Sequence, residues 1–174
     1  METMVLRIFQ REVERQCRFG LMAVEDVKQA LQTPDMDLLW YSIQSFLVAA
    51  GNVSKLLWKT TPRLPERGAE LRASLSIGDD SSLEPRAFRN HFEHFDERLE
   101  KWAISSERRN FADSNVGPEG MIQGIDPRDL LRNFDTTNFA VTFRGDLYHL
   151  QPMAEAIGDL WQKAAIEAKK LHWE

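Results

Sequence analysis

Residues 33–59, TPDMDLLWYSIQSFLVAAGNVSKLLWK, carry the clearest helical pattern in the chain and decide its fold class. Thr33 is a favoured residue at the N-cap of a helix, and Pro34 fits the first helical position. Apolar residues then recur at three- and four-residue spacing along one face: Leu39, Ile43, Phe46, Ala50, Val53 and Leu57. Such a face is buried in a folded protein, so this stretch predicts a helix that packs in a bundle.

Other segments predict helices that pack with this one. The first predicted helix has about eight turns, with an apolar stripe of Val5, Phe9, Val13, Cys17, Leu21, Val24 and Leu31. A short helix is expected within residues 66–75. Another begins near Pro85, is capped by Ser81 or Ser82, and buries Phe88, Phe92, Phe95, Leu99 and Trp102. The final helix follows Pro152 and buries Ile157, Leu160, Ala164, Ala168 and Leu171.

Residues 105–150 interrupt the helical pattern. Glycine and proline punctuate residues 105–130 without steady periodicity, and a loop of that length is either functional or poorly ordered. Phe139, Val141 and Phe143 then alternate with other residues before a Gly145-Asp146 turn, which predicts a small β-hairpin. The expected fold is therefore all-α, a bundle of four to five helices in a single domain over residues 1–174, with residues 105–150 as a loop and hairpin insertion before the last helix.

Composition narrows the classes of protein. The chain has 174 residues, is 43% hydrophobic and carries a formal net charge of −5, which suits one globular domain with its own core. No apolar run approaches the roughly 18 residues that cross a bilayer, and no secretory signal opens the chain, so we expect a soluble cytoplasmic protein without a membrane span. Cys17 is the only cysteine, which excludes an intramolecular disulfide and a cysteine-based zinc site. Because the chain is acidic, any nucleic-acid surface must be local.

The stretch RNHFEHFDERLEKW, residues 89–102, carries the chemistry of interest. His91, His94 and Glu97 are spaced three and three along one helix, so a second helix or His149 would complete a site for a divalent metal ion. In an ordinary reading, His91 packs beside the phenylalanine stripe and His94 is solvated. The sequence holds no Gly-rich phosphate loop, nucleophile elbow or HExxH motif, and we expect no cofactor.

A third interpretation rests on a family resemblance. Arg89, Asn90 and His94 match the Arg-Asn-x-x-x-His form of the motif of HEPN domains, which are small helical bundles found in many prokaryotic toxins and defence nucleases. The looser spacing of Arg and His also occurs for Arg86 with His91 and for Arg144 with His149, but of these three arginines only Arg89 is followed by Asn. The resemblance covers roughly residues 1–104, whereas the loop and hairpin depart from the family.

The resemblance implies a function. Active HEPN domains are metal-independent ribonucleases in which Arg and His from two subunits meet across a dimer interface. His94 would then exchange protons with the ribose 2′-hydroxyl or the leaving oxygen, and Arg89 would hold the scissile phosphate. Asn90 would orient this pair, and His91 is an auxiliary acid or base. The implied partners are a second copy of the chain, an RNA substrate and an antitoxin or other defence protein. The alternative within the family is a non-catalytic dimerisation or binding module of a toxin–antitoxin or defence system.

The first predicted helix offers a candidate RNA-binding surface. Arg7, Arg11, Arg15 and Arg18 fall within roughly 80° of one another at helical spacing. They form either a track for RNA phosphates or an ordinary charged face.

Overall fold

A computed structural model describes residues 1–174 except residues 60, 85–93, 119, 172 and 174. Its contacts divide the chain into two compact units. The helical unit comprises Met1–Arg86 and Met153–Glu174, and the sheet unit comprises Ala87–Pro152. The single domain expected over residues 1–174 stays a prediction. Among the described residues, no helix combines the length and the hydrophobicity that crossing a membrane would require.

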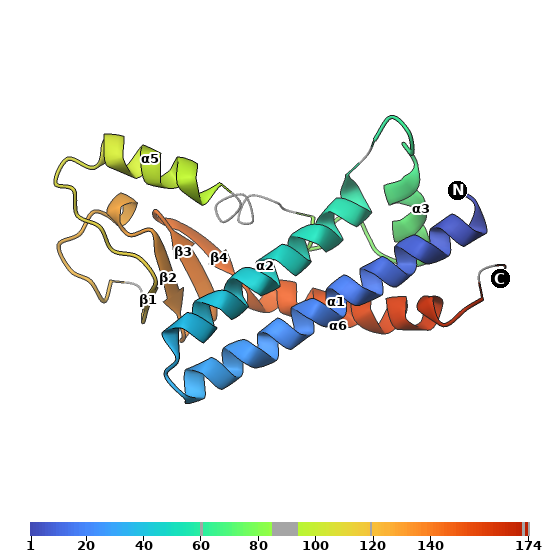
Figure 1. Cartoon of the computed structure of the whole chain (residues 1–174), viewed down its shortest axis with the longest axis horizontal. Coiled ribbons are helices and arrows are strands. Elements are labelled where there is room, and N and C mark those ends of the chain that lie inside the picture. The colour runs from blue at the N-terminus through green and yellow to red at the C-terminus, as the bar shows by residue number, and fades with distance from the viewer. Residues whose placement is uncertain (60, 85–93, 119, 172, 174) are drawn as a thin grey trace. The chain divides into compact units, whose positions relative to one another are not determined.

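The helical unit is built on an antiparallel pair, α1 (Thr3–Gln32) and α2 (Met36–Trp58) (Figure 1). The helix predicted from residues 33–59 is present, but it begins two residues later than its predicted first residue, Pro34. The cap is Asp35, whose Oδ1 accepts a hydrogen bond from the Leu38 amide at 2.9 Å. Thr33 instead ends α1, because its hydroxyl donates to the Gln29 carbonyl at 3.2 Å.

The apolar stripe of α2 is buried as predicted, whereas the buried face of α1 departs from its predicted stripe after Cys17. Val13 and Cys17 are fully buried, but the inner face then continues through Gly20, Ala23, Val27 and Ala30. Small residues there allow neighbouring helices to approach closely: a Cβ added to Gly20 would lie 3.3 Å from Ile157. Leu31, predicted to be buried, is 39% exposed. Burial raises the pKa of the Cys17 thiol to about 12, so this thiol fills the core and stays protonated.

Two further helices complete the helical unit. The short helix α3 spans Arg67–Ser74, and α6 spans Gln151–Ala168 and lies alongside α1 (Figure 1). Ile157, Leu160 and Ala164 of α6 are fully buried, as their spacing predicted. Leu171 lies beyond the end of α6 and is 47% exposed, so it does not extend the buried face.

The sheet unit holds four strands in the order β1-β2-β3-β4. They are β1 (Asn115–Val116), β2 (Arg132–Asp135), β3 (Ala140–Phe143) and β4 (Asp146–His149). The pair β1 and β2 is parallel, and the other pairs are antiparallel. The short 3₁₀ helix η1 spans Pro127–Asp129. The predicted hairpin is confirmed as β3 and β4. Its turn is centred on Arg144 and Gly145, with φ of 52° and 92°, so Phe143 pairs with Asp146.

The all-α class is therefore corrected to a mostly helical fold with a small four-stranded sheet before the last helix. The strands β1 and β2 were not predicted, because each is too short for alternation of apolar and polar residues to be recognised in the sequence. Strand pairing stabilises them instead: the Arg132–Asp135 strand uses its full length to pair with β3.

Candidate active site

The predicted motif helix can be followed only from His94 onward, because residues 85–93 lie outside the described residues. Its described part, α5 (Phe95–Ser105), starts after His94, whose backbone has φ −116° and ψ 43° and is not helical. Phe95, Leu99 and Trp102 form the half-buried face of α5, in agreement with their predicted spacing. The Phe95 ring meets the Phe143 ring edge-on, with the ring centres 6.2 Å apart. The helix that follows His94 is therefore held against the sheet.

His94 has one close partner. Its Nδ1 lies 3.2 Å from Oε1 of Glu97, one turn along α5, and the two side chains are 51% and 60% exposed. The Glu97 carboxylate beside Nδ1 orients the ring, while Nε2 makes no hydrogen bond with any described residue. The arrangement leaves one ring nitrogen accessible for proton transfer. Glu97 entered the sequence analysis only as a metal ligand, yet its three-residue spacing from His94 already placed it on the same face.

The other predicted catalytic residues, Arg89, Asn90 and His91, lie outside the described residues. The pairing of Arg89 with His94 stays a prediction. The alternative metal site also depends on His91. In the described ranges, no group of three or more His, Cys, Asp or Glu side chains is placed to hold a metal ion.

Two arginines of the sheet unit fix α5 in place. The Arg132 guanidinium lies 4.3 Å from the centre of the Phe95 ring, and its Nε donates to Oδ1 of Asp113 at 2.8 Å. Burial works to raise the pKa of Asp113, but the hydrogen bonds and charge of Arg132 outweigh it, so the pKa lies below its ordinary value. Arg144 donates to the Arg98 carbonyl at 3.3 Å and to the Ser105 hydroxyl at 2.9 Å.

The loosely spaced pair Arg144 and His149 is not a second catalytic pair. Arg144 lies in the hairpin turn and holds α5, whereas His149 is the last residue of β4 and is exposed. The intervening strand separates the two by about 3.3 Å per residue. Equal spacing in sequence therefore gives a different geometry in a strand.

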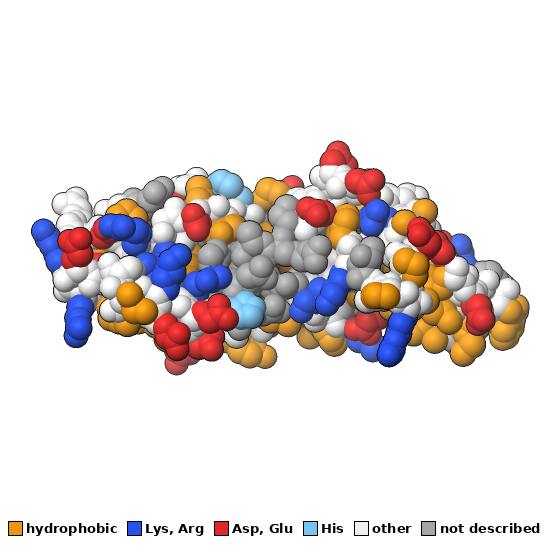
Figure 2. All heavy atoms as spheres, turned by 90° about the horizontal axis from the view of Figure 1, so that it is seen from above, with side chains coloured by type: hydrophobic (Ala, Val, Ile, Leu, Met, Phe, Trp, Pro, Cys, Tyr) orange, Lys and Arg blue, Asp and Glu red, His pale blue; other side chains and the backbone are white. Residues whose placement is uncertain are grey.

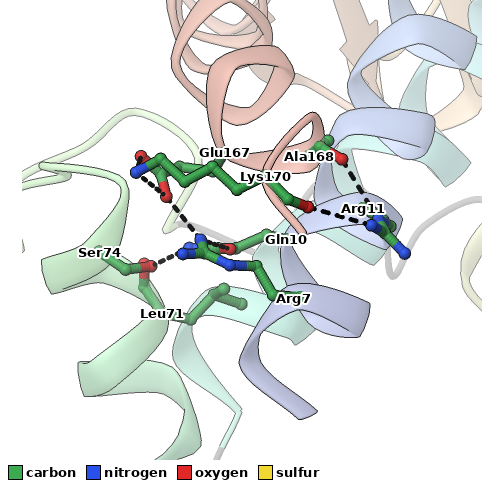
Figure 3. A network of polar contacts seen from close by, with 8 residues as sticks. All are labelled: Arg7, Gln10, Arg11, Leu71, Ser74, Glu167, Ala168 and Lys170. Carbon is green, nitrogen blue, oxygen red and sulfur yellow. Dashed lines mark hydrogen bonds and ion pairs between the residues drawn. The ribbon is translucent and has the colours of Figure 1, made fainter. Parts of the chain in front are cut away.

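The four arginines of α1 do not share one surface. Arg7 is buried and donates to Oε1 of Gln10 and to Oε2 of Glu167, both at 2.7 Å (Figure 3). Arg11 is half-buried and donates to the Ala168 and Lys170 carbonyls at the end of α6, each at 3.2 Å (Figure 3).

The other two arginines of α1 remain on the surface. The Arg15 and Arg18 side chains are 54% and 55% exposed, and each lies within 4 Å of a glutamate of α1, Glu12 and Glu14 respectively. Basic and acidic side chains are also interspersed on the face of the molecule drawn in Figure 2. A continuous four-arginine track is not formed, and RNA binding by Arg15 and Arg18 stays a prediction.

Comparison of the chain with models of protein families, with curated protein sequences and with solved structures finds no match.

Proposed function

We propose that this protein is a metal-independent endoribonuclease in which His94 transfers protons. The observation that carries the proposal is the half-exposed imidazole of His94, with Nδ1 beside the Glu97 carboxylate and Nε2 without a hydrogen-bond partner among the described residues. The Arg-Asn-x-x-x-His motif of residues 89–94 supports it from the sequence.

The reaction needs only groups that this motif supplies. His94 takes the proton of a ribose 2′-hydroxyl as the 2′-oxygen attacks the adjacent phosphorus. The bond from phosphorus to the 5′-oxygen breaks, and that oxygen receives a proton from a second imidazole, either His91 or the equivalent of His94 in a second copy. Arg89 balances the charge that builds on the phosphate, and Asn90 orients the pair. The products are a 2′,3′-cyclic phosphate and a 5′-hydroxyl.

This chemistry predicts the nature of the products and an independence of metal. The purified protein should carry no stoichiometric transition metal and should cleave single-stranded RNA in EDTA, leaving 2′,3′-cyclic phosphate ends. Single-stranded DNA should resist, because it lacks the nucleophile. Elemental analysis and mass spectrometry of the products test both statements. If the protein instead carried one zinc, iron or nickel ion per chain, and mutating His91 and His94 removed it, the ribonuclease proposal would be wrong and the metal-site interpretation would be favoured.

A composite site requires two copies, because one Arg89 and one His94 supply few groups for both proton transfers. A groove between α1 and α2 offers a surface for association. It has a volume of about 430 Å³, and its apolar lining includes Phe19, Met22 and Val48. These side chains are 46%, 59% and 43% exposed. Large exposed apolar side chains gathered in one groove are typical of an interaction surface.

The residues of α1 that continue from Phe19 toward the N-terminus support a second copy of the chain as the partner. Ile8, Glu12, Arg15 and Phe19 follow one another at four-, three- and four-residue spacing along one face of α1. A two-fold axis between Glu12 and Arg15 would set Glu12 of each copy against Arg15 of the other. The same axis would set Ile8 of each copy against Phe19 of the other.

The protein should therefore be a homodimer at tens of micromolar, and Phe19→Glu should convert it to a monomer. The free energy needed to bury the new carboxylate against a second copy exceeds the free energy that the contact contributes to association. Ile166→Glu is the matched control, since Ile166 is 64% exposed on α6, outside the groove, and should leave the dimer intact. Light scattering after size-exclusion chromatography gives the masses. A wild-type monomer would remove the composite site and favour the non-catalytic binding module, for which the same groove would receive another protein.

A further inference from the structure

The two faces of the sheet differ in chemistry. Phe143 lies on the face that α5 covers, since its ring contacts Phe95. Asn133 and Thr142 are paired across β2 and β3 and lie on the opposite face, because successive strand residues alternate. That second face is covered by residues 117–118 and 120–130, and a cavity of about 180 Å³ remains between them and the sheet.

The floor of this cavity holds polar groups that lack a full set of partners. Thr142 is 7% exposed, and its hydroxyl has no hydrogen-bond partner among the described residues. Asn133 is 3% exposed; its Nδ2 donates to the Gly117 carbonyl at 3.2 Å, but no described residue donates to its Oδ1. Neither the Thr142 hydroxyl oxygen nor Oδ1 of Asn133 is among the fully buried side-chain polar atoms that lack a partner in the described part of the chain, so both atoms are open to the cavity. The Thr142 hydroxyl and the Asn133 oxygen therefore offer a donor and an acceptor to a ligand.

The walls of the cavity are apolar. Met121, Ile122, Ile125 and Pro127 line it, together with Leu130, and none of the described lining residues carries a charge. Met121 is 50% exposed, and Ile122 and Ile125 are only half-buried, so the loop brings apolar surface over the sheet without filling the space beneath. The volume is close to that of an apolar cavity of about 150 Å³ that holds benzene in another protein. The volume of the cavity, its apolar walls and its polar floor together suit an uncharged ligand about the size of one aromatic ring.

We propose that this cavity binds a small neutral molecule with an apolar ring and a hydrogen-bonding edge. The edge carries an acceptor for the Thr142 hydroxyl and a donor for Oδ1 of Asn133, as a primary amide does. The ring lies against Met121 and Ile125. The site is on the face of the sheet opposite α5, so it is separate from His94 and independent of the ribonuclease proposal.

Benzamide is a suitable probe, with toluene as the control that has the ring and no polar edge. At millimolar concentration, benzamide should shift the backbone amide resonances of Met121, Asn133 and Thr142 in two-dimensional NMR spectra, whereas toluene should bind more weakly. Thr142→Val keeps the shape of the side chain and removes the hydroxyl. It should weaken benzamide binding about ten-fold, the loss expected for one hydrogen bond.

A second measurement distinguishes ligand binding by the Thr142 hydroxyl from a role of that hydroxyl in stabilising the fold. Since its hydroxyl has no partner in the free protein, Thr142→Val without ligand should leave the thermal midpoint unchanged or raise it. A clear fall would mean that the hydroxyl is already bonded and would overturn the proposal. Benzamide shifts that are absent, that map elsewhere, or that match in wild type and Thr142→Val would overturn it as well. None of these readouts depends on RNA cleavage, so failure of the ribonuclease proposal would be seen separately.

Discussion

His94→Ala should lower the rate of RNA cleavage by about 10²-fold or more, since general acid–base catalysis contributes roughly 10²–10⁴-fold. Arg89→Ala should cause a loss of about 10²–10³-fold, because the guanidinium would stabilise charge on the phosphate. His94 is 51% exposed beside Glu97, so its truncation opens no core cavity and the thermal midpoint should move little. Single-turnover cleavage of a labelled RNA gives the rates, and circular dichroism gives the midpoint.

His149→Ala is the matched control for this experiment. His149 is exposed and shares the loose motif spacing, but it lies on β4. Arg144→Ala is less suitable, because Arg144 bonds to two residues of α5 and its loss would disturb the helix that follows His94. An equal loss in His149→Ala would mean that the spacing selected the wrong histidine. Wild-type cleavage by both His94→Ala and Arg89→Ala would end the ribonuclease proposal.

Arg7→Ala should destabilise the helical unit by about 3 kcal/mol or more, the usual cost of removing one partner from a buried ion pair. The Arg7 side chain is 8% exposed and its Glu167 partner 18%. Truncation would also take a hydrogen bond from Gln10, whose amide continues the network to the Ser74 hydroxyl of α3 at 2.9 Å (Figure 3). One side chain therefore joins α1 to α6 and, through Gln10, to α3.

Urea unfolding measures this change, as a lower midpoint at constant slope. The matched control is Arg15→Ala on the same helix: the Arg15 pair with Glu12 is exposed, so its removal should cost about 0–1 kcal/mol. Similar stability of the two variants would contradict a structural role for Arg7. If Arg7→Ala instead weakened RNA binding and left the free energy of unfolding unchanged, the predicted RNA-binding surface of four arginines would be supported.

The same network gives a pH dependence. Hydrogen bonds from Lys170 lower the pKa of Glu167 from its ordinary 4.5; burial opposes this, and the bond from Arg7 adds to it. A lowered folded-state pKa contributes stability that is present above pH 4.5 and is lost as the pH falls through the folded value. The difference in stability between wild type and Arg7→Ala should therefore shrink in acid below pH 4.5. A difference that stays constant would mean that Glu167 is not the partner that matters.

The sequence by itself determined the helices and the hairpin. Leu39, Ile43 and Phe46 recur at the period of a helix, and alternation around Val141 with a glycine turn marks a hairpin. These signals are local: each needs only the spacing of residues along a short stretch. For the candidate site, the same periodicity predicted the half-buried face of Phe95, Leu99 and Trp102, whereas His94 was selected by the family resemblance of residues 89–94.

Tertiary structure alone decided which polar residues lie inside. Arg7, Arg11, Arg15 and Arg18 look equivalent on a helix, but Arg7 meets a carboxylate from a helix 160 residues away, which makes its burial favourable. The strand β2 likewise forms because β3 offers it backbone partners, and the cavity beneath the loop exists because Asn133 and Thr142 are set side by side by strand register. Each of these depends on groups that are distant in sequence, because the energy of a buried charge or an unpaired backbone group is set by what lies opposite it in space.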